Sequence, residues 1–263
     1  MSGKALLVVS FGTSVAQTRA VTIDAIVERL AAEFPERALY TAWTSTRIVK
    51  KVREERGELH DTLDEAFDRL TADGIDDVLV ASTCLLDGGE TRKIAAAVEA
   101  WVRDGRVAHL ADPLLFTKED GTALAKALCE EFDDKVGQDA LLFMGHGSAH
   151  ASNVEYLYVQ QGFEDMGRSN YLVATLEGVP TFEVALEVLA HNGAARVHLA
   201  PLMIVAGDHA LNDMTGPGDD TWQSRLQAHG YQVEPVVRGL GEYAGVRDLI
   251  CAHARAALRR AGK

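Results

Sequence analysis

Three side chains that can bind a metal ion follow apolar runs in the second half of this 263-residue chain. They are His146 in GHG, Glu177 in ATLEG and His209 in MIVAGDH. Two imidazoles and one carboxylate are a suitable ligand set for a divalent first-row metal ion. A neutral imidazole also accepts protons near neutral pH. These residue types predict a metal site with proton-transfer chemistry.

Other interpretations of the same residues stay open. A single histidine after a strand is more often a surface residue, and Glu177 could simply cap the helix that follows it. Asp208 could cap a helix or orient the His209 ring. Glycines beside the three residues would let a flat ligand lie close to the backbone; they are Gly145, Gly147, Gly178 and Gly207.

The elements that must position these residues are short apolar runs alternating with longer amphipathic segments. This alternation predicts an α/β fold with parallel sheets flanked by helices. In such sheets, ligands bind beyond the carboxyl ends of the strands. The expected strands are 4–10, 38–43, 76–82, 106–112, 139–145, 170–176, 196–205 and 231–237, and the expected helices include 15–33, 58–73, 91–103, 181–192 and 242–260.

The two halves of the chain follow one plan, which predicts a duplicated domain. Aligning KALLVVSFGTS with DALLFMGHGSA places Phe11 opposite His146, and two further alignments occur in the same order. We expect an N-terminal domain over 1–130 and a C-terminal domain with the metal site over 131–241. The segment 242–263 is expected to be a closing helix that packs back on the N-terminal domain.

Composition narrows the functional class. The formal net charge of −13 argues against a non-specific nucleic-acid binder. No run is long enough to span a membrane, and the N-terminus lacks the pattern of a signal peptide. Three separated cysteines suit a reducing compartment, so we expect a cytoplasmic protein. There is no GxxxxGK[ST] nucleotide loop, and no GxGxxG follows the first strand.

The motifs around the three residues resemble the anaerobic (class II) sirohydrochlorin cobalt chelatases, the CbiK family. They are GHGS at 145–148, TLEGVP at 175–180 and PLMIVAGDHALNDM at 201–214, with VVSFGTS at 8–14 and DGGE at 87–90 in the first half. The resemblance covers nearly the whole chain. It implies two similar α/β domains with an active-site cleft for a tetrapyrrole between them.

The resemblance also implies residue roles. His146, Glu177 and His209 match the metal-binding and catalytic positions, and Glu90 matches an acidic position that faces the cleft. Cys84 stands where the family leads us to expect a histidine, so that position's accessory role is in doubt. The implied reaction is ATP-independent insertion of Co²⁺ into sirohydrochlorin, a lyase reaction of anaerobic cobalamin biosynthesis, with no nucleotide cofactor.

Sirohydrochlorin carries many carboxylates, so we expect cations in the cleft. Arg47, close to the end of the second expected strand, is the best candidate, although this basic segment could equally be a solvated helix face. Phe11 and Met203 could contact the face of the macrocycle.

Three alternatives remain at this point. Fe²⁺ could replace Co²⁺ and give siroheme, because the two ions are neighbours in the Irving–Williams order. A nickel chelatase fits the full length less well. A non-catalytic metal- or tetrapyrrole-binding protein would share the fold. A homo-oligomer is an option that the sequence leaves open.

Overall fold

The computed structural model describes residues 3–103, 105–147 and 151–260, and the chain folds into two compact units. Unit 1 comprises Met1–Leu114 and Arg247–Lys263, and unit 2 comprises Leu115–Val246. The boundary therefore lies earlier than the expected 130/131. Helix α6 (Lys118–Val136) runs unbroken through that position. Its polar residues there alternate with buried apolar ones at helical spacing, so one side of the helix stays buried within unit 2.

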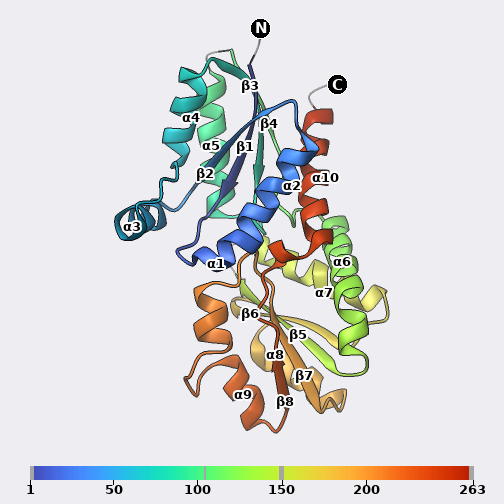
Figure 1. Ribbon diagram of the computed structural model, residues 1–263. Coiled ribbons are helices and arrows are strands. Elements are labelled where there is room, and N and C mark those ends of the chain that lie inside the picture. Colours follow the sequence, from blue (N-terminus) through green and yellow to red (C-terminus); the bar gives the residue numbers. More distant parts are fainter. Residues whose placement is uncertain (1–2, 104, 148–150, 261–263) are drawn as a thin grey trace. The chain divides into compact units, whose positions relative to one another are not determined.

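Unit 1 contains a parallel sheet with the strand order β2-β1-β3-β4. Residues 5–9 of its central strand β1 are all apolar and buried, as expected where helices cover both faces. Figure 1 shows this sheet between its helices. The strands are β1 (Gly3–Ser10), β2 (Ala38–Trp43), β3 (Ile75–Ser82) and β4 (Val107–Leu110).

Two helices of unit 1 begin at side-chain caps, Ser45 before the helix from Thr46 and Thr62 before the helix from Leu63. Thr62 and Glu65 form a capping box, so this helix starts five residues later than 58–73 suggested. The expected helix 15–33 contains a π-helical turn, η1. The elements are α1 (Ala16–Arg19), η1 (Ala20–Asp24), α2 (Ala25–Glu33), α3 (Thr46–Arg56), α4 (Leu63–Ala72), α5 (Gly89–Val102) and the C-terminal α10 (Ala244–Arg260).

Unit 2 repeats the same topology. Its parallel sheet has the order β6-β5-β7-β8, so the first strand of each unit lies between the second and the third. This shared order agrees with the duplication expected from the sequence. The strands are β5 (Ala140–Gly147), β6 (Tyr171–Glu177), β7 (Arg196–Pro201) and β8 (Gln232–Pro235).

Strand β7 is shorter than the expected run 196–205. It ends at Pro201, although Leu202 N still donates to Met144 O of the neighbouring strand β5 at 2.8 Å, and bends follow from Met203. The other elements of unit 2 are η2 (Ala151–Val154), α7 (Glu155–Asp165), α8 (Phe182–His191), the π-helical turn η3 (Ala210–Met214), α9 (Trp222–Ala228) and η4 (Leu240–Glu242).

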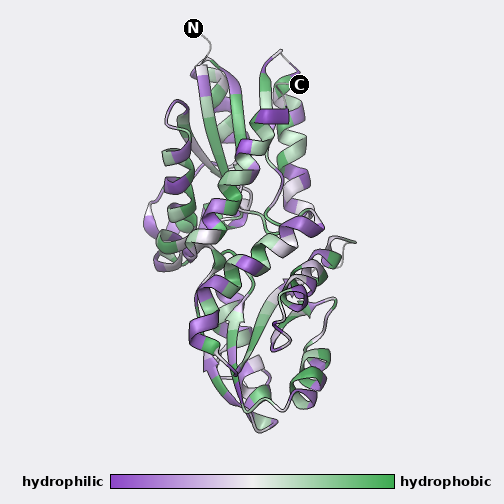
Figure 2. Cartoon of the chain, turned by 90° about the vertical axis from the view of Figure 1, so that its right-hand side faces the viewer, coloured by the Kyte–Doolittle hydropathy of each residue, from purple (hydrophilic) through white to green (hydrophobic). Residues whose placement is uncertain are grey.

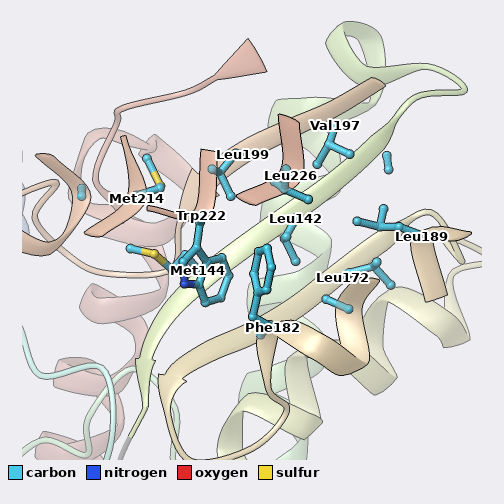
Figure 3. Packing of buried hydrophobic residues seen from close by; sticks show 14 of the residues in the cluster. Leu142, Met144, Leu172, Phe182, Leu189, Val197, Leu199, Met214, Trp222 and Leu226 are labelled. Carbon is cyan, nitrogen blue, oxygen red and sulfur yellow. The ribbon is translucent and has the colours of Figure 1, made fainter. Parts of the chain in front are cut away.

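Burial of apolar side chains holds each unit together. Figure 2 shows hydrophobic strands and helices with both hydrophobic and hydrophilic sides. Leu142 and Met144 of β5 pack with Phe182 and Trp222 on one face of the unit 2 sheet (Figure 3). Among the described residues, no helix has the length and apolar character needed to cross a membrane.

Candidate metal-binding and catalytic site

His146 lies at the carboxyl end of β5, the central strand from which the order of unit 2 runs in both directions. Alternation along the strand puts it on the same face as Leu142 and Met144. Its side chain is exposed, and its Nδ1 lies 3.1 Å from the Gly147 carbonyl oxygen. This end of β5 therefore presents an exposed imidazole on the face of the sheet that carries the core residues Leu142 and Met144.

The glycines around His146 are required by the protein itself. A Cβ on Gly145 would meet the ring of Tyr156, and one on Gly147, whose φ is +83°, would overlap the carbonyl oxygen of Glu177. The buried Tyr156 hydroxyl accepts a hydrogen bond from Gly147 N at 3.2 Å. These two glycines thus allow close internal packing, whereas the sequence suggested close approach of a ligand.

His209 is the N-cap residue of η3, the turn that follows β7. Its Nδ1 lies 2.6 Å from Asp213 Oδ2, one turn further along. Asp208, which the sequence suggested as a partner of this ring, instead accepts a hydrogen bond from Asn212 at 2.9 Å. The carboxylate bonded to the His209 ring is therefore that of Asp213 and not that of Asp208.

The two histidines come together although they are distant in the sequence. The centroids of the His146 and His209 rings are 4.6 Å apart, and the ring planes are at 83° to each other. Both side chains reach solvent, so a molecule can approach the pair.

Glu177 ends β6, the strand beside β5, and its backbone pairs with Gly147. Alternation places the preceding Leu176 on the face of the His146 side chain, where it packs against the core, and Glu177 on the other face. In the described part of the chain, no three His, Cys, Asp or Glu side chains are arranged to hold one metal ion. The structure thus brings the two histidines together but not the full set of three.

The remaining residues expected near a substrate are distributed over both units. In unit 1, Phe11 is 52% exposed directly after β1, and Arg47 is exposed in the first turn of α3. Glu90, in the first turn of α5, bonds Lys93 at 2.6 Å through Oε1. In unit 2, Met203 is half-buried against the core cluster.

Cys84 follows the end of β3 and packs against the core of unit 1. Burial raises the pKa of its thiol to about 11, so the group stays protonated at neutral pH and is a poor metal ligand. The environment of Cys84 therefore does not support an accessory role for this residue in metal binding. Ser148 and His150 lie outside the described residues.

Sequence reasoning missed two residues that hold this site. Asp213 follows His209 by four positions, and residues at this spacing face each other on a helical turn. A helical conformation over 209–214 would therefore have predicted the contact between His209 and Asp213. Tyr156 carried no comparable signal, because its contact with Gly147 depends on how α7 packs on the sheet.

Comparison with known families identifies the chain. The family described as cobalt chelatase (CbiK) matches residues 4–259. The chain belongs to this cobalt chelatase family. It is 36% identical to the sirohydrochlorin cobaltochelatase of Salmonella typhimurium over 98% of this chain and 97% of that protein. It is 30% identical to the sirohydrochlorin cobaltochelatase CbiKC of Nitratidesulfovibrio vulgaris over 98% of this chain and 92% of that protein.

Solved structures of related chelatases share the fold. SirB from Bacillus subtilis with Fe³⁺ matches with a TM-score of 0.67 at 14% identity, covering 99% of this chain and 97% of that chain. CbiX, described as the terminal enzyme for biosynthesis of siroheme in denitrifying bacteria, matches with a TM-score of 0.55 at 19% identity, covering 97% of this chain and 99% of that chain. At these identities the likeness shows the fold alone.

Proposed function

We infer that this member of the cobalt chelatase family is a sirohydrochlorin cobaltochelatase of anaerobic cobalamin biosynthesis. The observation that carries this conclusion is the match to the family and its curated relatives over nearly the whole chain. The enzyme inserts Co²⁺ into sirohydrochlorin. Neither Fe²⁺ nor a purely binding role has better support.

The reaction exchanges protons for a metal ion. Two pyrrole N–H protons leave the macrocycle, Co²⁺ forms bonds to the ring nitrogens, and two protons pass to acceptors. A hydrated Co²⁺ must also lose its water ligands. The site therefore needs groups that bind the ion reversibly and bases that accept protons, and the balance requires no nucleotide.

Neutral imidazoles meet both requirements. We assign metal binding to His146 and His209, because their rings lie 4.6 Å apart at one edge of the sheet. In each ring Nδ1 faces an oxygen acceptor, so Nε2 can provide its lone pair to the metal. As Co²⁺ passes to the macrocycle, the released imidazoles accept the ring protons.

Glu177 is proposed as the third ligand. It ends the strand beside β5 with an exposed side chain but faces away from His146, so this strand end would have to rearrange for its carboxylate to join an ion held by the histidines. The negative charge would offset part of the metal's charge and favour loss of its water. Glu90 is proposed to provide a second acidic group toward the substrate from unit 1.

We propose that Arg47 binds a carboxylate of sirohydrochlorin. It is exposed, and no described residue forms an ion pair with it, so its guanidinium is available for a bidentate contact. The exposed ring of Phe11 and the accessible part of Met203 are proposed to contact the flat face of the macrocycle.

Anaerobic assay with sirohydrochlorin and Co²⁺ tests the function. We expect many turnovers per enzyme, followed by the absorption change of the metallated product, and faster insertion of Co²⁺ than of Fe²⁺ or Ni²⁺. Faster Fe²⁺ insertion would assign the enzyme to siroheme formation. Binding of one equivalent without turnover would assign a binding role. Cell fractionation tests the expected cytoplasmic location.

A further inference from the structure

The turn η3 carries a carboxylate that holds the His209 ring. Asp213 Oδ2 lies 2.6 Å from His209 Nδ1, a short, strong hydrogen bond. An ionised carboxylate only accepts hydrogen bonds, so Nδ1 carries the proton and Nε2 keeps its lone pair. We propose that Asp213 is a positioning residue of the cobalt site, which fixes the His209 tautomer and directs Nε2 to the metal; this rests on the proposed function.

The turn gives this bond a fixed geometry. Ala210 and Met214 are fully buried in the core of unit 2 and anchor both ends of η3. The Thr215 hydroxyl donates to Ala210 O at 2.9 Å and closes the turn. Asp213 is therefore held beside His209 by buried neighbours, while its own side chain remains about half exposed.

The neighbouring carboxylate has a different partner. Asp208 Oδ1 accepts a hydrogen bond from the Asn212 side chain at 2.9 Å and is not bonded to the imidazole. The two aspartates flank His209 on the same segment and carry the same charge. Asp208 is thus a matched control that separates the hydrogen bond from the general effect of a nearby negative charge.

A partner of this kind matters for metal binding. A carboxylate at the second nitrogen makes an imidazole a better electron-pair donor and restricts the ring to the orientation needed by the ion. Removal of such a partner typically lowers metal affinity by about 10- to 100-fold. The half-exposed side chain of Asp213 lines a pocket of about 300 Å³ next to the end of β6 and is not part of the apolar core, so its replacement should leave that core intact.

Three variants separate the contributions. Asp213→Ala removes both the acceptor and the charge, Asp213→Asn keeps an acceptor oxygen without the charge, and Asp208→Asn removes the control charge. Nitrogen NMR of the metal-free proteins, recorded over a series of pH values, reports the His209 tautomer. Titration with Co²⁺ alone reports the affinity.

We expect the Nδ1–H tautomer in the parent and in Asp208→Asn, and a shift toward Nε2–H in Asp213→Ala. The Kd for Co²⁺ should rise about 10- to 100-fold in Asp213→Ala, less in Asp213→Asn, and no more than about threefold in Asp208→Asn. An unchanged tautomer in Asp213→Ala, or equal losses of affinity in Asp213→Ala and Asp208→Asn, would overturn the proposal.

These measurements are independent of turnover. Circular dichroism checks that each variant is folded, and Asp213→Asn preserves the test if the alanine variant is unstable. If the parent inserts no cobalt but the tautomer shifts as expected, the proposed function fails and the positioning of His209 stands. If the parent turns over normally and the tautomer does not respond, only the positioning role fails.

Discussion

At the scale of single residues, the proposed chemistry depends on two imidazoles that share one edge of a sheet. The ring centroids of His146 and His209 are 4.6 Å apart, and each Nδ1 has an oxygen neighbour. Such a pair can bind an ion through two Nε2 atoms and then take up two protons. In the proposed mechanism, one residue type thus serves both metal delivery and proton removal.

Replacement of either histidine should abolish most of the activity. We expect His146→Ala and His209→Ala each to lower the rate of cobalt insertion by at least about 100-fold, because each removes a proposed metal ligand and proton acceptor. The rate is measured anaerobically from the product spectrum. His229→Ala is the control, since its ring lies against the Arg225 carbonyl oxygen at the end of α9. Parental rates in either site variant would refute the assignment.

Arg47 should affect substrate binding and not the chemical step. Arg47→Ala is expected to raise KM for sirohydrochlorin about tenfold with little change in kcat, because one charged hydrogen bond contributes about 1.5 kcal/mol. Lys50→Ala, on the same helix, removes a cation that already faces Glu54 at 3.8 Å. Equal effects of the two substitutions would show that this basic segment is a solvated helix face.

At the scale of elements, the end of β5 is held in place by helix α7. The Tyr156 ring fills the space left by Gly145, and its hydroxyl accepts the hydrogen bond from Gly147. Burial raises the pKa of this phenol to about 12, so it stays neutral over the working range of the enzyme. The position of His146 between the two glycines therefore depends on α7.

Loss of the Tyr156 hydroxyl should destabilise the protein. Tyr156→Phe leaves the buried Gly147 N–H without its acceptor, and we expect the free energy of unfolding to fall by about 1–3 kcal/mol in urea denaturation. Tyr158→Phe, on the same helix, is the control and should change stability by less than about 0.5 kcal/mol.

The pH dependence of this difference follows from the raised pKa. The folded state retains the phenolic proton more strongly than the unfolded state, so its stabilising contribution is complete below about pH 10. The contribution is then lost as the pH rises toward the folded pKa of about 12. A difference between parent and Tyr156→Phe that already falls between pH 6 and 8 would contradict this account.

At the scale of the whole molecule, the chain completes unit 1 with its last helix. The chain leaves unit 2 after Val246 and re-enters unit 1 at Arg247. Within unit 1, α10 lies beside α2 (Figure 1). Arg29 bonds Asp248 at 2.9 Å, and Arg255 pairs with Glu33. Arg29 and Arg255 together hold the pKa of Glu33 below its usual value, so these contacts weaken in acid.

The buried face of α10 should contribute strongly to stability. Ile250 is 3% exposed, and Ile250→Ala should lower the free energy of unfolding by about 2–5 kcal/mol because it leaves a cavity. Arg259→Ala alters the exposed side of the same helix and should have little effect. Urea denaturation measures both, and similar small effects would show that α10 is not part of the core.

Much of the fold was determined by the sequence. Each of the eight expected strands corresponds to one in the structure, because buried parallel strands are continuous apolar runs that stand out against amphipathic helices. The common order of the two sheets agrees with the repeat that aligned Phe11 with His146. The family motif at 201–214 pointed to the cobalt chelatases, to which the chain belongs.

Other features were decided only by the tertiary structure. The boundary between the units lies before α6, earlier than the sequence suggested, because α6 packs within unit 2. The local composition of α6 does not reveal this packing. The π-helical turn determines that Asp213, and not Asp208, bonds the His209 ring. The pleat of β6 determines that Leu176 and Glu177 lie on opposite faces of the sheet. Hydrophobic periodicity shows which residues of one helix or strand are buried, but not which distant segment covers them. The contact of His146 with His209 arises from strand order and turn geometry, which bring distant segments together.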